Sequence, residues 1–412
     1  MAEKRVYALE SRVLMGQLLD NHYVQAKKAK EEGRKVAWCI GQVDTNLVVA
    51  MDYQPVYPEN HACLCGSRGV STQHCEVAEA HDYSPDLCSY ARNDLGTIFS
   101  GGTMSPVGGL PRPDLLLAAT MCNTHLKWWE ALARHFQVPL LVLDTPFLHP
   151  HLTAQETESI VDYTRDQLQE HIHALEGLTG RPFNYDRLQQ AVDYTARAAR
   201  LYGQVVLAGK HVPSPITAFD LFLHLGPLMT YRGFPQAVQY YEALLAEVEA
   251  RKKQNFSAVG EEVYRLYWDN IPIWFKVGYL GRKFASHGAC MVAALYPFAW
   301  LDAFGKLDPA QPLDSIARCQ VFIFLNRAVD YRVDLLSQVV LDYKVDGLVM
   351  QMSRSCKPYI TDQYTIMKEV ERRTGRPGVI VEGDMVDTRL FAEAEVDGRL
   401  DSFLELLARR KG

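Results

Sequence analysis

Three cysteines, Cys88, Cys122 and Cys356, are the residues of this 412-residue chain best placed for chemistry. Cys122 follows the apolar run DLLLAATM and Cys356 follows DGLVMQM, and a helical pattern comes after each cysteine. In open parallel sheets the carboxyl ends of the strands face the ligand crevice, where helix-start N–H groups stabilise negative charge. Thiolates at these positions suit an anionic iron–sulfur cluster. Cys88, at the start of a helical stretch in DYSPDLCSYARNDLG, is the predicted third thiolate.

The spacing of the nine cysteines leaves other interpretations open, because the chain has no C-x-x-C pair. Structural cysteines are the simplest alternative, and Cys39, Cys290 and Cys319 lie in or beside apolar runs, as small buried hydrophobes do. A second group has the composition of a zinc site, although its C-x-C spacing is short for zinc ligands. That group consists of Cys63, Cys65, Cys75, His61, His74 and His81.

Composition and charge exclude several functional classes. The net charge of −6 and the interspersed acidic and basic residues provide no general attraction to nucleic acid or to an anionic membrane. No apolar stretch approaches the ~18 residues of a membrane span, and the N-terminus lacks the apolar core of a signal peptide. We therefore expect a cytoplasmic protein whose cysteines are free, metal-bound or catalytic.

Short apolar runs alternate with helical patterns in both halves of the chain, which predicts parallel sheets with right-handed crossovers. The predicted strands are KVAWCIGQV and the two apolar runs of residues 114–146 in the first half, and IPIWF, ACMVAALY, CQVFIFL, DGLVMQM and PGVIVEGD in the second. The predicted fold class is α/β: two doubly wound parallel-sheet lobes, a helical connecting region, and an iron–sulfur cluster between the lobes.

The expected organisation has four parts. They are an N-terminal helical segment (1–34, with its helix over 4–33), a first lobe (35–150) with Cys88 and Cys122, a mainly helical connection (151–258), and a second lobe (259–412) with Cys356. In the connection, Thr153 with Glu156 predicts a capping box and Asn184 predicts a second helix start. Residues 55–109 are rich in Gly, Pro, Ser, His and Cys, which predicts loops and short helices.

Competing motifs are weak. The Gly-rich GGTMSPVGG has no lysine placed as in a phosphate-binding loop, and the chain has no G-x-S-x-G elbow. Glu382 and Asp384 end the run VIVEGD, where they can bind a polar ligand or cap the following turn.

Five ordered segments extend a resemblance over most of the chain. They are AEAHDYSPDLCSYARNDLG, LPRPDLLLAATMCNTHLKWWEALARHFQVP, VPSPITAFD with GPLMTYRG, VDGLVMQMSRSC, and EVERRTGRPGVIVEGDMVDTRLF. In these segments the chain resembles the benzoyl-CoA reductase and 2-hydroxyacyl-CoA dehydratase family, and it looks closest to the larger cluster-bearing subunit of ATP-dependent benzoyl-CoA reductases.

The resemblance implies a [4Fe–4S] cluster held by Cys88, Cys122 and Cys356, with a fourth iron site that is open or filled by a small ligand. It also implies a related, cluster-bearing sister subunit, so that the protein works as a hetero-oligomer. A separate ATP-hydrolysing iron–sulfur activator would deliver the electrons. The absence of a phosphate-binding loop is consistent with a recipient of electrons rather than the ATPase.

The chemistry implied by the resemblance is the addition of one electron to an aryl-CoA thioester, which needs a low-potential cluster, exclusion of water and a supply of protons. His125, three residues after Cys122, and His74 or His81 before Cys88 are the candidate proton donors, each with a structural hydrogen-bonding role as the alternative. Arg92, Arg354 and Lys357 flank the cysteines, where they would offset cluster charge, hold CoA phosphates or serve as ordinary surface charges.

The first hypothesis is therefore a subunit of an ATP-dependent aryl-CoA reductase that converts the aromatic ring to a cyclic dienoyl-CoA in anaerobic aromatic degradation. The alternatives are a 2-hydroxyacyl-CoA dehydratase subunit, an electron-relay subunit and a double-cubane cluster reductase. One fold would serve all four functions. Cys63, Cys65 and Cys75 leave a fourth thiolate ligand open.

Overall fold

The strands of the protein form two four-stranded parallel sheets in the computed structural model, which describes residues 8–411. The first sheet has the order β2-β1-β3-β4, with β1 at Val36–Cys39, β2 at Gln54–Val56, β3 at Leu115–Ala119 and β4 at Leu140–Leu143. The second has the order β6-β5-β7-β8, with β5 at Tyr264–Asp269, β6 at Ala289–Ala294, β7 at Gly347–Ser353 and β8 at Gly378–Gly383. This confirms the predicted α/β class with two parallel sheets.

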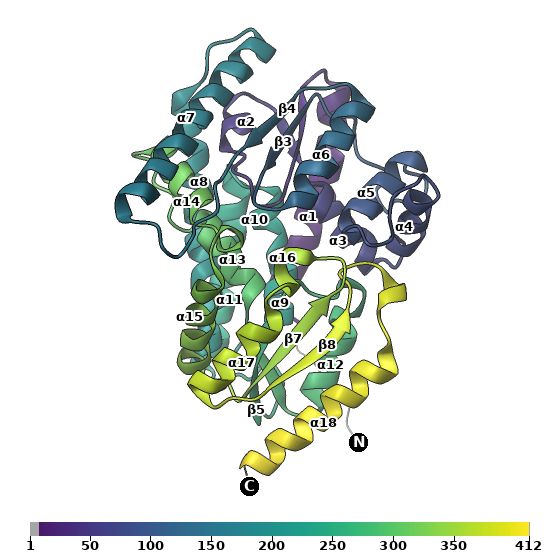
Figure 1. Ribbon diagram of the computed structural model, residues 1–412, viewed down its shortest axis with the longest axis vertical. Coiled ribbons are helices and arrows are strands. Elements are labelled where there is room, and N and C mark those ends of the chain that lie inside the picture. The colour runs from purple at the N-terminus through teal and green to yellow at the C-terminus, as the bar shows by residue number, and fades with distance from the viewer. Residues whose placement is uncertain (1–7, 412) are drawn as a thin grey trace.

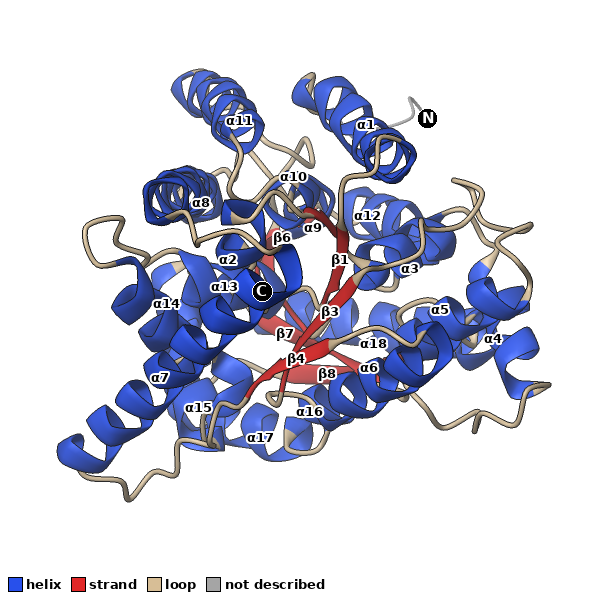
Figure 2. Ribbon diagram, turned by 90° about the horizontal axis from the view of Figure 1, so that it is seen from above, coloured by secondary structure: helices blue, strands red, loops and turns tan. Residues whose placement is uncertain are grey.

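The two sheets belong to two lobes that lie one above the other in Figure 1. Viewed from above, the strands occupy the centre of the molecule and helices surround them (Figure 2). Every residue of β1, β3 and β6 is buried. Such continuous apolar strands are typical of parallel sheets covered on both faces. β3 and β7, the strands that precede Cys122 and Cys356, each lie between two neighbouring strands of their sheet.

Helices connect and cover the strands. In the first lobe they are α1 (Ser11–Glu31), α2 (Asn46–Ala50), α3 (Pro58–Ser67), α4 (Ser71–Glu79), α5 (Ser89–Phe99) and α6 (Asn123–Phe136). The connection contains α7 (Ala154–Thr179), α8 (Tyr185–Leu207), η1 (Ala208–Lys210), α9 (Ala218–His224), α10 (Gly226–Thr230) and α11 (Pro235–Lys253). The second lobe has η2 (Trp274–Lys276), α12 (Val277–Ser286), α13 (Leu295–Phe304), α14 (Pro312–Val321), η3 (Phe324–Asn326), α15 (Val329–Asp342), α16 (Lys357–Ile360), α17 (Gln363–Thr374), η4 (Thr388–Leu390) and α18 (Glu393–Lys411).

The predicted helix starts of the connection are confirmed. The Thr153 side chain accepts a hydrogen bond from the Glu156 backbone N–H, and the Glu156 side chain accepts one from the Thr153 backbone, which completes a capping box. Asn184 caps α8 by accepting from the Arg187 N–H. Gly180 ends α7 with a φ of 66°, a left-handed conformation that glycine adopts without steric cost.

Two of the predicted strands are wrong. Residues 271–275 lead into the short helix η2, and the strand of this region is β5, immediately before them. β5 contains the charged residues Arg265 and Asp269, which are buried and interrupt the apolar pattern expected of a buried strand. Residues 319–325 contain the end of α14 and the start of η3. This helix is buried on several faces, and a short apolar run of that kind is indistinguishable from a strand by periodicity.

Residues 55–109 are more helical than their composition suggests, because α3, α4 and α5 occupy much of this range. The expected N-terminal helix is present as α1, while residues 4–7 of the prediction lie outside the described part of the chain.

The four domain boundaries stay a prediction. The helix α8 contacts both α2 of the first lobe and α13 of the second, so the connection packs against both lobes. Within residues 8–411, no helix combines the length and apolar character that a membrane crossing requires.

Candidate active site

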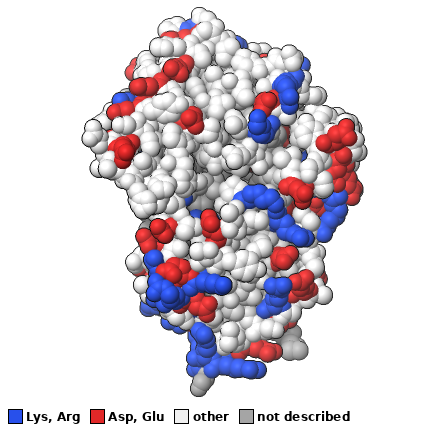
Figure 3. Space-filling view, in the orientation of Figure 1, with Lys and Arg blue, Asp and Glu red and all other residues white. Residues whose placement is uncertain are grey.

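Cys88, Cys122 and Cys356 line one cavity between the two lobes, which we call the cysteine cavity. Each cysteine is the residue immediately before a helix: Cys88 before α5, Cys122 before α6 and Cys356 before α16. In the space-filling view the surface is hollowed at the boundary between the lobes, and Lys and Arg side chains lie beside it (Figure 3). The fold therefore brings together three thiols that are far apart in the sequence.

The surroundings of Cys88 and Cys356 favour the neutral thiol. Burial raises the pKa of Cys88 to about 12, with Cys122 as a second cause, although the backbone N–H groups of Ala91 and Tyr90 act in the opposite direction. Burial, with Cys88 and Cys122 nearby, also raises the pKa of Cys356 well above its ordinary value. The N–H groups at these helix starts are the donors that an anionic cluster needs. Metal binding here would displace the thiol protons.

The donor set suits a cluster better than a single ion. Among the residues that the structure describes, no three His, Cys, Asp or Glu side chains are arranged to hold one metal ion. In a four-iron cluster, each of three thiolates binds a different iron, so the sulfurs need not converge on a single point. Three thiols around one internal cavity, approached by helix-start N–H groups, fit such a group.

The rest of the cysteine cavity is largely aromatic and apolar. Its lining includes Tyr90, Tyr296, Trp300, Tyr359, Ile271 and Met385. Walls of this kind exclude water and provide flat surfaces for an apolar or aromatic group.

His125 and Glu59 form an ion pair that lines the cysteine cavity. Glu59 Oε1 lies 2.8 Å from His125 Nε2, and both side chains are only about 15% exposed. Burial by itself would lower the pKa of His125, but Glu59 and then Cys122 outweigh it and raise the pKa to about 9. His125 Nδ1 is buried and has no hydrogen-bond partner among the described residues. This ring nitrogen is therefore available to hydrogen-bond a bound molecule, as the sequence prediction of a proton donor requires.

The replacement Glu59→Gln is expected to lower the pKa of His125 from about 9 to below its ordinary value of 6.5, because burial then dominates. In the wild type, His125 holds its proton more tightly in the folded state. Its contribution to stability is complete below about pH 6.5 and is lost as the pH rises through about 9. Histidine NMR of the apoprotein measures this pKa, and the His125→Gln variant assigns the signal. An unchanged pKa in Glu59→Gln would contradict the pairing.

Arg232 is a fully buried cation behind the same cavity. Its NH1 donates to the Gly41 carbonyl at 2.5 Å, and its guanidinium lies 4.6 Å from the Phe304 ring centre and 5.7 Å from that of Trp300. Gly41 and Trp300 line the cysteine cavity, so Arg232 fixes part of its wall. Burial by itself would raise the pKa of Glu59, but His125, the Gly41 N–H and Arg232 together lower it.

A buried hydrogen-bond network joins the loops that carry Cys88 and Cys356. The Ser89 N–H donates to Ser355 Oγ at 3.1 Å, and Ser355 Oγ donates to Asp384 Oδ2 at 2.5 Å. Asp384 Oδ1 also accepts from the N–H groups of Val386 and Asp387, both at 3.1 Å. Asp384 therefore caps the turn after β8 and, through Ser355, connects the two cysteine loops.

Charged residues strengthen the same contact between lobes. Arg92, which is buried, pairs with Asp387 at 2.8 Å and with Glu79 at 2.6 Å. Arg389 pairs with the same two carboxylates. Of the three basic residues predicted near the cysteines, Arg92 is thus committed to a structural ion pair. Arg354 and Lys357 are exposed, and Lys357 Nζ donates to the Arg354 carbonyl.

The structure does not place His74 at the cysteine cavity. Its Nδ1 contacts Asn93 Oδ1 at 3.1 Å between α4 and α5, and burial lowers its pKa. His81 is exposed and stacks on Phe99. Neither position supports the predicted role of proton donor.

In the second group of cysteines and histidines, no three described side chains are arranged around one metal position, so the structure gives no support to the zinc interpretation. Cys65 lies 3.5 Å from His61 Nε2, Cys75 donates to the Ser89 carbonyl, and Cys63 donates to the Tyr90 hydroxyl. None of these three thiols lines the cysteine cavity, and a fourth thiolate from this group stays a prediction. Cys39, Cys290 and Cys319 are buried, which confirms their prediction as small buried hydrophobes.

Sequence reasoning missed Glu59 and Arg232. Glu59 stands in the turn-like YPEN, and Arg232 stands in GPLMTYRG, a single charge among apolar residues and glycine. A lone charge in an apolar segment is the signal that would have identified Arg232, since such a charge is either exposed or buried with partners. Glu59 has no comparable local signal.

The fold and the cavity define a two-lobed α/β protein with a thiol-lined internal site. Residues 42–407 match the family described as "2-hydroxyglutaryl-CoA dehydratase, D-component", and the chain belongs to this family. The (R)-2-hydroxyisocaproyl-CoA dehydratase alpha subunit of Clostridioides difficile is 33% identical over 100% of this chain and 98% of its own length. A benzoyl-CoA reductase subunit of Thauera aromatica is 31% identical over 97% of this chain and 95% of its own length. Lactoyl-CoA dehydratase subunit alpha of Anaerotignum propionicum is 29% identical over 93% of both chains.

Proposed function

We propose that this chain is the cluster-bearing subunit of an aryl-CoA reductase, which converts a benzoyl-CoA-type thioester to a cyclic dienoyl-CoA. The observation that carries the proposal is the cysteine cavity, where three thiols from separate helix starts meet beside aromatic walls. Membership of the family and the similarity to a benzoyl-CoA reductase subunit support the substrate class. The reaction consumes two electrons and two protons for each ring reduced.

Cys88, Cys122 and Cys356 would hold a four-iron cluster, which when bound supplies electrons of low potential to the thioester. The remaining residues have separate tasks. Tyr90, Tyr296, Trp300 and Tyr359 would orient the ring and exclude water. His125, kept protonated by Glu59 up to about pH 9, would hold a proton at Nδ1 for delivery to the reduced acyl group.

The electrons must come from outside this chain. We propose as partners a related cluster-bearing sister subunit and an ATP-hydrolysing iron–sulfur activator. The relatives are each named as one subunit of a dehydratase or a reductase, which supports a multi-subunit assembly. The exposed Arg354 and Lys357 beside Cys356 would be accessible to such partners.

A second candidate is a 2-hydroxyacyl-CoA dehydratase subunit, a lyase that returns its electron and brings no net reduction. The observation that favours it is the 33% identity over the whole chain to the (R)-2-hydroxyisocaproyl-CoA dehydratase alpha subunit. The same cavity would serve both reactions, because each begins with one electron added to a thioester.

Anaerobic purification of the chromosomally tagged protein with its natural partners would test the proposal. We expect about one four-iron cluster per copy of this chain. With ATP and with titanium(III) citrate as electron donor, benzoyl-CoA should be converted to a dienoyl-CoA with two electrons consumed per product. Conversion of (R)-2-hydroxyisocaproyl-CoA to the enoyl-CoA without net electron consumption would instead establish the dehydratase. A complex without iron after anaerobic purification would overturn both candidates.

A further inference from the structure

A second cavity lies beside the cysteine cavity, and the function proposed above does not use it. It is lined by residues of α1, α3, α9 and α10, together with Trp274 and Tyr296, and we call it the apolar slot. Met15, Leu19, Leu64, Leu225 and Met229 provide much of its surface. Asp20 and Ser67 also line it and are exposed, so the slot extends to the surface of the protein.

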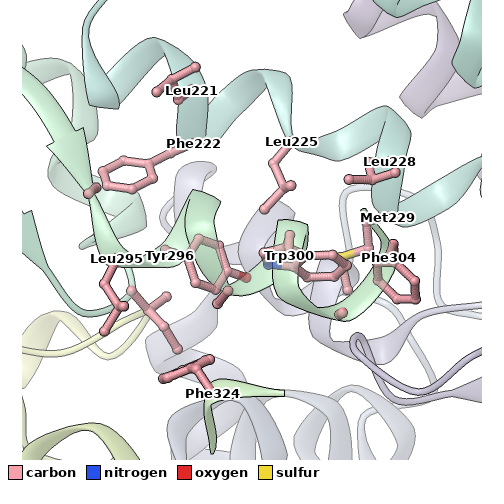
Figure 4. Close-up of a cluster of buried hydrophobic side chains, with 14 of the residues drawn as sticks. Leu221, Phe222, Leu225, Leu228, Met229, Leu295, Tyr296, Trp300, Phe304 and Phe324 are labelled. Atoms are coloured by element: carbon pink, nitrogen blue, oxygen red, sulfur yellow. The ribbon is translucent and has the colours of Figure 1, made fainter. Parts of the chain in front are cut away.

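The apolar slot and the cysteine cavity share a wall. Tyr296 lines both, and its ring lies 6.3 Å from Phe222 of the slot and 6.2 Å from Trp300 of the cysteine cavity, measured between ring centres. In Figure 4, Leu225 and Met229 extend from the segment of α9 and α10 toward Tyr296 and Trp300 of α13. Tyr296 therefore separates two adjoining spaces.

A second contact crosses the same wall. Cys63 of the slot donates its thiol hydrogen to the hydroxyl of Tyr90, which lines the cysteine cavity, at 3.2 Å. Trp274 of the slot donates its ring N–H to the same hydroxyl at 2.5 Å. Glu59 and Asn60, consecutive residues of α3, line the cysteine cavity and the slot respectively.

The size and chemistry of the slot select its occupant. Its volume is about 110 Å³, close to the ~150 Å³ of an engineered apolar cavity that binds benzene. No Lys, Arg or His side chain of the described residues lines it, so it offers no cationic partner for a phosphate. A short alkyl chain or one ring fills such a space, whereas the pantetheine arm of CoA is longer and carries two amides that need hydrogen bonds.

We propose that the apolar slot receives the end of the acyl group remote from the thioester and that it thereby sets the acyl length the enzyme accepts. The thioester would lie in the cysteine cavity, and the Tyr296 side chain would turn aside from the shared wall to admit the acyl end to the slot. This inference rests on the proposed action on CoA thioesters. It holds for an aryl group with an apolar substituent and for a branched alkyl chain.

Leu19 allows a direct test, because it lies on the surface helix α1 and is only partly buried. Leu19→Trp fills the slot, and Leu19→Ala enlarges it. Leu14→Trp is the matched control, since Leu14 lies on the same helix, is 39% exposed and does not line the slot. The probes are S-ethyl-, S-butyl-, S-hexyl- and S-octyl-CoA, thioethers that lack a reducible carbonyl, and the affinity of the purified complex is measured by calorimetry.

For the wild type we expect the affinity to rise by roughly fourfold per added methylene until the slot is full. Leu19→Trp should weaken S-hexyl-CoA by at least about 10-fold and leave S-ethyl-CoA within about twofold. Leu19→Ala should extend the rise to a longer chain, which tests the slot even if the tryptophan variant folds poorly. Leu14→Trp should match the wild type.

Other outcomes would overturn the inference. If Leu19→Trp lowered the affinity for all four thioethers equally, another part of CoA would occupy the slot. If it changed the affinity for none of them, the acyl group would bind elsewhere. A wild-type complex that binds none of the thioethers would contradict the proposed function as well. The chain-length dependence thus separates failure of the slot assignment from failure of the function.

Discussion

Replacement of Cys122 by alanine is expected to remove the four-iron cluster and to reduce the conversion of the thioester substrate by more than about 100-fold. Changes in residues that only support metal ligands cost about 10-fold to 100-fold in metal affinity or activity, so the loss of a ligand should cost more. Cys122 lines the cysteine cavity together with Cys88 and Cys356, and no fourth cysteine of the described residues lines it and could take its place. Iron and sulfide analysis after anaerobic purification measures the loss directly.

Cys319→Ala is the control for this replacement. Cys319 is also buried, but it lies on α14 away from the cysteine cavity. We expect the Cys319→Ala complex to retain the iron and the activity of the wild type. Full iron content in Cys122→Ala would remove Cys122 from the cluster site, and equal losses in both variants would indicate a general folding defect.

Asp384→Ala is expected to lower the free energy of unfolding by about 3–5 kcal/mol, because it leaves the buried Ser355 hydroxyl and two backbone N–H groups without their acceptor. The same change releases the contact between the loops of Cys88 and Cys356. We therefore expect the cluster to be lost more readily to a chelator, with iron affinity reduced by about 10-fold to 100-fold. Chemical denaturation and the rate of iron loss measure the two effects.

Two variants separate these effects from a general loss of charge. Asp384→Asn keeps an acceptor oxygen of the same size and should retain most of the iron. Asp401→Ala removes an exposed carboxylate that pairs with Lys283, and should change the stability by less than about 1 kcal/mol. Iron loss in Asp384→Ala no faster than in Asp401→Ala would show that the Ser355–Asp384 contact does not hold the cysteine loops.

Local apolar patterns in the sequence were sufficient to predict some of the strands and insufficient for others. The apolar runs before Cys122 and Cys356 became β3 and β7, because continuous apolar character bounded by turns is typical of buried parallel strands. β5 was not predicted because it contains two charged residues, Arg265 and Asp269. Both are buried, and their hydrogen-bond partners come from distant segments of the chain. The pattern of residues 319–325 failed for the opposite reason, since a buried helix has the same apolar run.

Separation along the chain did not predict which residues reach the cysteine cavity, as the histidines show. His74 is nearer to Cys88 in the chain than Glu59 is to any of the three cysteines, but α4 packs on α5 and buries His74 outside the cysteine cavity. Glu59, in contrast, reaches His125 from α3 across 66 residues. Proximity along the chain gives no information on which face of a helix meets the cavity.

The sequence by itself determined that Cys122 and Cys356 follow strands, that all three cysteines precede helices, and that the architecture is α/β with two sheets. These properties follow from local apolar patterns and from the short range of helix and turn signals. Only the tertiary structure decided that the three thiols share one cavity, that Glu59 raises the pKa of His125, that Asp384 joins two cysteine loops, and that an apolar slot adjoins the site. Each of these depends on how the two lobes and the connecting helices pack, and contacts between residues far apart in the chain leave no local pattern in it.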